Sequence, residues 1–225
     1  MPPAPQERPP PAKPGAGGPT PTPPHTSAVA QRLQAAAPEG IEIIDLHRDY
    51  AILAIQGPLS DEVLESLGLP VEHEYMSFAD GTIAGHDVTV CRTGYTGEDG
   101  FEIYVDPTEA ARIWNELMEA GKEFGIKPAG LGARNTLRLE AAMALYGHEI
   151  DATISPLEAD LKWIVKCDKG DFIGRAVLEE QQSAGITRKL VGFEMQGRGI
   201  GRDGYEVQID GERAGWVTSG GPAPT

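Results

Sequence analysis

Residues 94–102 read GYTGEDGFE, a glycine-rich loop that runs into a stretch of alternating apolar side chains. The three glycines permit positive φ angles and the close approach of a ligand to the backbone. The stretch from Phe101 to Val105 alternates in the way typical of a strand with one buried face. We therefore expect a loop followed by a strand, with the polar side chains of the segment kept out of the core.

The acidic side chains of this segment restrict the ligand that it could bind. No Lys, Ser or Thr follows the glycines as in a phosphate loop, and Glu98 and Asp99 would repel an anion. A carboxylate beside a glycine-rich turn fits a ligand rich in N–H donors. Glu102 stands among largely apolar neighbours, where a half-buried carboxylate is costly unless it is hydrogen-bonded. It is a candidate binding residue, and the alternative is a solvent-facing strand residue; Glu98 and Asp99 are expected to be solvated.

Two arginines form the second candidate group. Arg134 and Arg138 are four residues apart on a helix predicted from about Leu131, so both side chains point the same way. A guanidinium fork can donate to a carbonyl or carboxylate of a ligand. The alternative is a pair of salt bridges to Glu140 or to the acidic surface.

Short runs rich in β-branched residues predict ordered structure from about residue 41. Strands are expected over residues 41–46, 50–55, 75–83, 87–92 and 101–105. Ser60 and Asp106 are the predicted caps of two helices, the second of which carries an apolar stripe and ends at Gly121. Because strands alternate with helices, residues 41–150 predict a layered α/β domain.

The pattern changes from about Lys189 onward. Short strands separated by glycine turns are expected over residues 190–195, 206–209 and 215–218. This pattern indicates the beginning of a separate small β-domain, with residues 151–188 as the connecting segment.

Residues 1–40 differ from the remainder in composition. The first 24 residues hold 11 of the 19 prolines, interspersed with Ala, Gly and Thr. So few side chains worth burying cannot offset the entropy of ordering the chain, and we expect a disordered Pro/Ala-rich tail over residues 1–40. The segment has the pattern of neither a transit peptide nor a signal peptide.

The chain is strongly acidic, with a formal net charge of −15. Such a field repels phosphate backbones and anionic membranes, so neither nucleic acid nor a membrane is an expected partner. Two cysteines are too few for a disulfide framework, and His86 and His148 lack a second ligand at metal spacing, so no metal site is predicted. No apolar run approaches the roughly 20 residues that cross a bilayer. We expect a soluble, cytoplasmic protein.

Five segments of the sequence carry a resemblance to a known family. They read GYTGEDGFEIYV, GLGARNTLRLEAAMALYGHEID, ISPLEADLKWIV, KGDFIGR and WVTSGG, and they occur in this order. Together they resemble the aminomethyltransferases, or T-proteins, of the glycine cleavage system, over roughly residues 28–225. One glycine-rich loop would be a weak signal, whereas five ordered segments are specific.

The resemblance implies a fold. It is a ferredoxin-like, folate-binding α/β (α+β) middle domain over residues 41–150, followed by an incomplete C-terminal β-barrel domain over residues 189–225. The resemblance also implies a chain truncated at both its N-terminus and its C-terminus relative to the family.

The implied activity is the glycine cleavage reaction that depends on tetrahydrofolate. The aminomethyl carbon moves from the lipoyl arm of the H-protein to tetrahydrofolate, with release of ammonia. By resemblance, the pterin-binding glutamate of the family falls on Glu102 and its folate-contacting arginine on Arg134, while Tyr95 lines the same pocket. A pterin edge offers adjacent N–H donors, and an ionised carboxylate can accept two of them.

The acid/base aspartate of the family has no counterpart in this chain. It belongs to a strand upstream of the segment matched here, and Asp45, Asp61 and Asp80 stand at unrelated places. No catalytic residue is therefore predicted. Two alternatives stay open, a noncatalytic folate-binding fragment and the folate-binding domain of a related demethylating oxidase. A third relative, a folate-dependent protein of iron–sulfur assembly, is disfavoured because Asp171 stands where that group has a cysteine.

Overall fold

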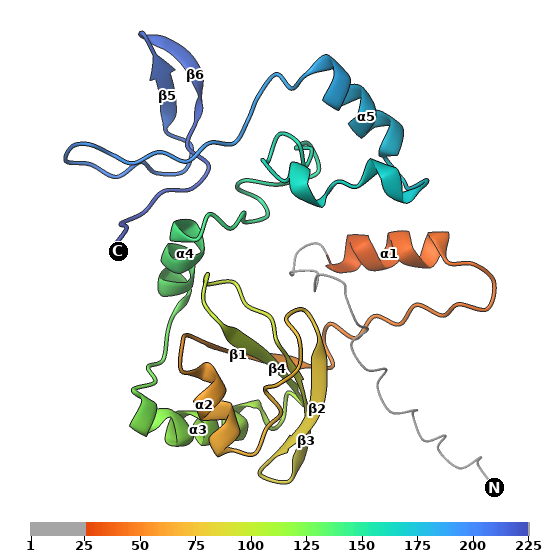
Figure 1. The fold of residues 1–225 in the computed structure, drawn as a ribbon, viewed down its shortest axis with the longest axis vertical. Helices are drawn as coiled ribbons and strands as arrows, with labels where there is room; N and C mark the ends of the chain where they lie inside the picture. Colours follow the sequence, from red (N-terminus) through yellow and green to blue (C-terminus); the bar gives the residue numbers. More distant parts are fainter. Residues whose placement is uncertain (1–25, 225) are drawn as a thin grey trace, which may run out of the picture. The chain divides into compact units, whose positions relative to one another are not determined.

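The computed structural model describes residues 26–224, which form two compact units. The first unit comprises residues 26–94 and 98–128, and the second comprises residues 95–97 and 129–224 (Figure 1). Residues 41–150, which we predicted to form one folate-binding domain, therefore contribute to both units.

The first unit is built on a four-stranded sheet that is antiparallel throughout. Its strands lie in the order β1-β4-β3-β2. They are β1 (Ala51–Gln56), β2 (Phe78–Ile83), β3 (His86–Cys91) and β4 (Gly100–Val105). Helices α2 (Ser60–Ser66) and α3 (Ala110–Ala120) cover one face of this sheet (Figure 1), and the short helix η1 (Gly121–Phe124) follows α3. The predicted α/β class, with sheet and helices in separate layers, is confirmed.

The register of the sheet places alternate residues of β4 in the core. Phe101, Ile103 and Val105 are buried with side chains from α2 and α3, and Ile113 and Leu117 are the buried residues of α3. The residues between them in β4 point to the opposite face of the sheet and are only half-buried. We call this second face, which neither α2 nor α3 covers, the open face.

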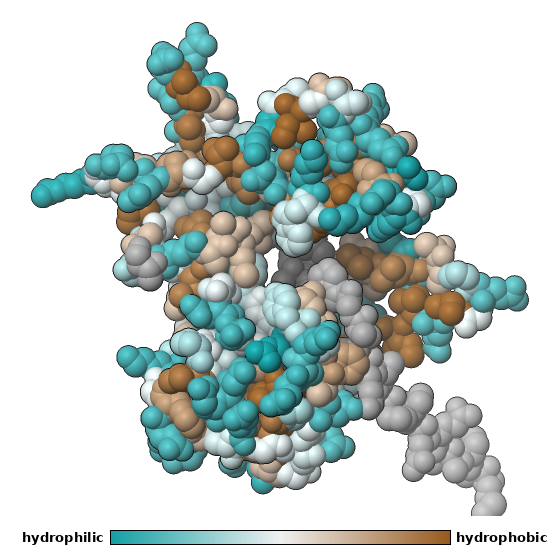
Figure 2. Space-filling model, in the orientation of Figure 1, coloured by the Kyte–Doolittle hydropathy of each residue, from teal (hydrophilic) through white to brown (hydrophobic). Residues whose placement is uncertain are grey.

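Two predictions near the start of the described chain are wrong. We predicted a disordered tail over residues 1–40, but part of it, Thr26–Ala36, forms helix α1. These eleven residues include no proline and consist mostly of residues that favour helix, such as Ala, Gln, Arg and Leu. Residues 1–25 lie outside the described residues. The strand predicted over residues 41–46 is irregular, with Ile41 and Ile44 exposed. Apolar side chains of α1 and the segment after it lie at the right of Figure 2.

A third difference concerns the start of α3. The helix begins at Ala110 rather than directly after the predicted cap, Asp106. Asp106 instead accepts hydrogen bonds from the Thr108 backbone N–H and hydroxyl, at 2.8 and 2.6 Å, which forms a turn before the helix.

The second unit contains short elements joined by irregular segments. They are α4 (Leu131–Glu140), η2 (Lys162–Ile164), η3 (Cys167–Lys169), α5 (Arg175–Ala184), β5 (Glu206–Ile209) and β6 (Glu212–Trp216). β5 and β6 pair as an antiparallel hairpin, and the described residues show no closed barrel. The predicted strand over residues 190–195 is irregular, and the strand predicted at 215–218 lies at Glu212–Trp216 instead.

Within residues 26–224, no helix has the length and apolar character that crossing a membrane requires. The same residues contain no group of three or more His, Cys, Asp or Glu side chains placed to hold a metal ion.

Candidate functional site

The glycine-rich loop is held by a polar side chain at the end of β1. The Nε2 atom of Gln56 donates to the carbonyl oxygens of Thr93 and Phe101, each at 3.2 Å. A Cβ atom at Gly100 would lie 2.6 Å from the Gln56 amide, and one at Gly94 would also collide with this side chain. Two of the three glycines thus make room for Gln56, whereas the sequence suggested that they make room for a ligand.

Glu102 lies on β4, between β1 and β3. In the register of the sheet it stands opposite Ala54 on one side and Cys91 on the other. Its half-buried carboxylate accepts a hydrogen bond from the Thr93 hydroxyl at 2.6 Å on Oε2. Burial, followed by the negative charge of Glu102, raises the pKa of Cys91 to about 11. The carboxylate therefore has a fixed hydrogen-bond donor and belongs to the open face rather than to the core.

The exposed turn of the loop has a different role. Glu98 and Asp99 are exposed, as expected of turn residues, and the Asp99 carbonyl accepts a hydrogen bond from the Gly57 N–H at 2.8 Å. The backbone of the turn therefore ties the loop to the end of β1 while its carboxylates face solvent.

A cleft of about 540 Å³ lies on the open face of the sheet. Two tyrosines of its lining, Tyr50 and Tyr104, meet edge to face with ring centroids 6.1 Å apart. Its carboxylates are Asp49, Asp80, Asp87 and Asp106, and the lining includes no Lys or Arg. This cleft is therefore acidic and aromatic, which favours ligands that carry N–H donors over anions.

Tyr95 and Arg134 come together in the second unit. The guanidinium carbon of Arg134 lies 4.4 Å from the centroid of the Tyr95 ring, a cation–π arrangement. The Tyr95 hydroxyl donates to the carbonyl oxygen of Ala144 at 2.6 Å. Burial raises the pKa of Tyr95, although Arg138 and Arg134 oppose this effect. Across the part of the chain that the structure describes, Arg134 makes no ion pair, so its N–H groups can serve a ligand.

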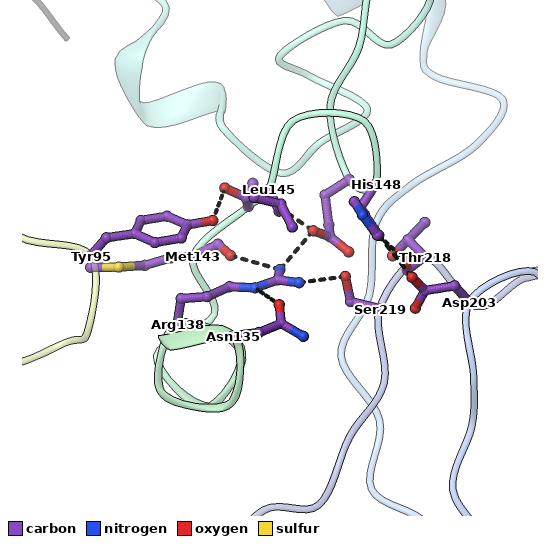
Figure 3. A network of polar contacts seen from close by, with 11 residues as sticks. Tyr95, Asn135, Arg138, Met143, Leu145, His148, Asp203, Thr218 and Ser219 are labelled. Atoms are coloured by element: carbon purple, nitrogen blue, oxygen red, sulfur yellow. Dashed lines mark hydrogen bonds and ion pairs between the residues drawn. The ribbon is translucent and has the colours of Figure 1, made fainter. Parts of the chain in front are cut away.

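Arg138 has a contrasting environment, one helical turn further along α4 (Figure 3). Its side chain is 1% exposed and pairs with Glu149 at 2.8 Å. The same guanidinium donates to Asn135 Oδ1 at 2.8 Å, to the Met143 carbonyl at 3.2 Å and to Ser219 Oγ at 2.7 Å. The sequence allowed for salt bridges from both arginines to Glu140 or to the acidic surface, whereas Arg138 forms a buried ion pair with Glu149.

The partner carboxylate and a neighbouring histidine extend this network. Glu149 accepts a hydrogen bond from the Leu145 backbone N–H at 2.9 Å. The Nδ1 atom of His148 lies 2.9 Å from Asp203 Oδ2 and 3.1 Å from the Thr218 carbonyl oxygen (Figure 3). These contacts join the segment after α4 to residues near the C-terminal end of the described chain.

Of the three predicted binding residues, the structure brings Tyr95 and Arg134 into contact, and it places Glu102 in the first unit. The sequence reasoning did not identify Thr93 or Gln56. A signal for each was present, because Thr93 directly precedes the glycine-rich loop and Gln56 is the polar residue that directly follows the apolar run YAILAI.

The fold and these side chains define a class of protein. The first unit offers a hydrogen-bonded carboxylate, which suits the N–H donors of a ligand. The second unit offers a guanidinium beside a tyrosine ring, which suits carbonyl acceptors. Together with the α/β fold, each of these features fits the class of proteins that bind small molecules.

Comparison with known proteins identifies the family. Residues 22–169 match the family model described as the GCVT N-terminal domain, and residues 188–225 match the glycine cleavage T-protein C-terminal barrel domain. The chain belongs to the glycine cleavage T-protein family.

Similar proteins of known name agree with this assignment. The chain is 50% identical to an aminomethyltransferase of Alkaliphilus metalliredigens over 82% of its length, and 51% identical to that of Caldanaerobacter subterraneus over 82%. It is 48% identical to that of Mycobacterium bovis over 89%. These matches cover 51%, 50% and 55% of the three relatives, so the chain spans about half the length of the curated relatives that it matches.

A solved structure supports the fold. The aminomethyltransferase T of the glycine cleavage system from Bartonella henselae aligns with a TM-score of 0.77 and 33% identity. The alignment covers 89% of this chain and 55% of that chain.

Proposed function

We propose that this chain carries the tetrahydrofolate site of a glycine cleavage aminomethyltransferase. Its relatives at 48–51% identity bear the name aminomethyltransferase. The observation that carries the folate assignment is the carboxylate of Glu102, which is half-buried on the open face and hydrogen-bonded by Thr93. Such a carboxylate is a ready acceptor for the paired N–H donors of a pterin edge.

In the proposed reaction, the aminomethyl carbon leaves the sulfur of a lipoylated H-protein and is bonded to tetrahydrofolate as a methylene group. Ammonia is released, and the lipoyl arm is left as a dithiol. Tetrahydrofolate is the cofactor that accepts the carbon, the lipoylated H-protein is the proposed partner, and the cytoplasm is the proposed compartment. We assign no residue of this chain to the acid/base step.

Each predicted binding residue receives a role in this proposal. Glu102 accepts N–H groups of the pterin, and Arg134 donates to a folate carbonyl while its guanidinium lies over the Tyr95 ring. The contact supports the second assignment, because an arginine that lies over an aromatic ring keeps the N–H groups at the edge of its guanidinium available to acceptors.

Calorimetric titration with tetrahydrofolate tests the binding assignment. Glu102→Ala should weaken binding at least about tenfold, because hydrogen bonds to a charged group are worth about 1.5–3 kcal/mol. Glu98→Ala is the matched control, since it removes an exposed glutamate from the same loop and should bind like the wild type. Equal affinities of the wild type and the Glu102→Ala variant would contradict the role of Glu102.

A second assay separates binding from transfer. Ammonia release from aminomethylated H-protein measures the reaction, and we expect little or no turnover by this chain alone. Binding of tetrahydrofolate without ammonia release would favour the alternative function, a noncatalytic folate-binding chain. Under this alternative, the chain holds the folate and takes no part in the transfer step.

A further inference from the structure

Thr93 lies where β3 passes into the glycine-rich loop, and its backbone is held on both sides. Its N–H donates to the Cys91 carbonyl at 3.0 Å, and its own carbonyl accepts the hydrogen bond from Gln56 at 3.2 Å. The preceding residue, Arg92, donates its N–H to the Ser77 carbonyl at 3.0 Å. The backbone of Thr93 is therefore positioned by contacts from β1, β3 and the segment before β2.

The side chain of Thr93 transfers this fixed position to Glu102. The Thr93 hydroxyl donates to Glu102 Oε2 at 2.6 Å, a length typical of a hydroxyl bound to an ionised carboxylate. A carboxylate has two oxygens and about four acceptor sites, so one hydrogen bond leaves Oε1 wholly available to a ligand. Thr93 consequently orients the carboxylate and takes only one acceptor site of Oε2, so acceptor sites on both oxygens remain for the ligand.

Orientation matters because a glutamate side chain is flexible. Holding such a side chain in one rotamer costs conformational entropy. A hydrogen bond that already fixes the rotamer before the ligand arrives reduces the cost of binding. A pterin edge needs two parallel acceptors in one plane, so it benefits more from this orientation than a ligand with a single donor.

We propose that Thr93 is a positioning residue of the folate site, acting through Glu102 on the recognition of the pterin N–H groups. The inference rests on the proposed function, since it takes Glu102 to be the pterin acceptor. Thr93 itself makes no contact with the ligand in this proposal.

Two variants of the same residue test the role. Thr93→Val keeps the shape and removes the hydroxyl, and it should weaken tetrahydrofolate binding by about 3- to 10-fold. Thr93→Ser keeps the hydroxyl and should bind within about twofold of the wild type. A loss with serine as large as that with valine would show that packing of the methyl group matters instead, and would overturn the inference.

Thr108→Val is the matched control. The Thr108 hydroxyl also donates to a carboxylate at 2.6 Å, that of Asp106, and it lies in the same unit outside the sheet. Its removal should leave the affinity for tetrahydrofolate unchanged. Thermal unfolding of every variant, followed by circular dichroism, shows which of them are folded before their affinities are compared.

A change of ligand separates positioning from a general structural effect. A tetrahydrofolate analogue without the 2-amino group lacks one of the N–H donors that face Glu102. Thr93→Val should therefore weaken binding of tetrahydrofolate more than binding of this analogue. An equal loss for both ligands would overturn the proposal.

The same titrations distinguish failure of the inference from failure of the proposed function. If Glu102→Ala weakens binding and Thr93→Val does not, the folate site stands and the role of Thr93 is wrong. If the wild-type chain does not bind tetrahydrofolate, the proposed function itself fails, and with it the inference.

Discussion

Each of the two units is stabilised internally by a different kind of interaction. In the first, fully buried side chains such as Phe101, Ile103 and Leu64 form a continuous apolar core between the sheet and its helices. In the second, the largest fully buried side chain is Arg138, and its partner Glu149 is 6% exposed. Apolar burial in the second unit is confined to a few residues, namely Leu157, Ala159 and Val217.

This difference has consequences for tolerance to change. Apolar burial has no preferred direction, so a core of this kind loses stability in proportion to the atoms removed. A buried ion pair depends on every member of its network, because a charge that loses its partner remains desolvated. The second unit should therefore respond sharply to a few substitutions, whereas the first should respond in a graded way.

The largest effect is expected from Arg138→Leu. It leaves Glu149 buried without its cation, and breaking a buried pair in this way costs about 3–5 kcal/mol. Amide hydrogen exchange should show loss of protection in the second unit, around α4 and residues 143–150, with β1–β4 unchanged. Arg134→Leu is the control on the same helix, and because it removes a cation–π contact but no ion pair, its cost should be only about 0.5–1 kcal/mol. If both substitutions lowered the stability of the second unit equally, the two arginines would not differ in their contribution to stability.

A somewhat smaller effect is expected from Ile103→Ala in the first unit. The side chain is fully buried, and its truncation leaves a cavity at a cost of about 2–4 kcal/mol. Ile103→Val should cost about 1 kcal/mol, which would establish the graded response. Urea unfolding monitored by amide exchange checks both values, with protection in the second unit unchanged. A loss from valine as large as that from alanine would argue against a core governed by buried volume.

These contrasts show which features were open to sequence reasoning. The alternation of Phe101, Glu102 and Ile103 predicted both the strand and its buried face, because the side-chain period of a strand is local. Residues 41–46 have the composition of a strand, but they lie unpaired in the structure, and strand pairing depends on distant residues.

In the candidate site too, the sequence identified individual residues but not the contacts that they make. Glu102 stood out because of its apolar neighbours, whereas the hydrogen bond from Thr93 depends on the register between β3 and β4. Helical spacing placed Arg134 and Arg138 on one side of α4, but it could not tell which one meets a carboxylate eleven residues away, beyond the end of the helix. Local periodicity therefore predicts elements, and partners set by tertiary contacts require the structure.

A smaller effect is expected from Tyr95→Phe in the second unit. This change removes the hydroxyl that donates to the Ala144 carbonyl and retains the ring beneath Arg134. The free energy of unfolding of the second unit should fall by about 0.5–1.5 kcal/mol, the ordinary net contribution of one hydrogen bond. Tyr95→Ala should cost more and should also weaken tetrahydrofolate binding through Arg134. If phenylalanine and alanine have the same effect on affinity, the ring does not support the arginine.

The smallest effect is expected from mild acid, and it should be larger in the second unit than in the first. Burial raises the pKa of Glu149, but hydrogen bonds to the carboxylate and the charge of Arg138 outweigh it, so the folded-state pKa lies below the ordinary value of 4.5. The stabilisation that the ionised Glu149 gives to the folded second unit is therefore fully present above about pH 4.5. It is lost as the pH falls through the lower folded-state pKa.

The free energy of opening in the second unit, measured by amide exchange and corrected for intrinsic rates, should stay the same between pH 7 and pH 5. Below pH 4.5 it should fall, because the contribution of the Glu149 carboxylate is lost. Glu149→Gln should be less stable at neutral pH and should lack this acid-dependent loss, because it has no proton to bind. The apolar core around Phe101 and Ile103 contains no such ion pair, so its protection should change less over the same range. An equal acid response of both units would place the sensitive carboxylates elsewhere, and the buried pair would no longer explain how the units differ.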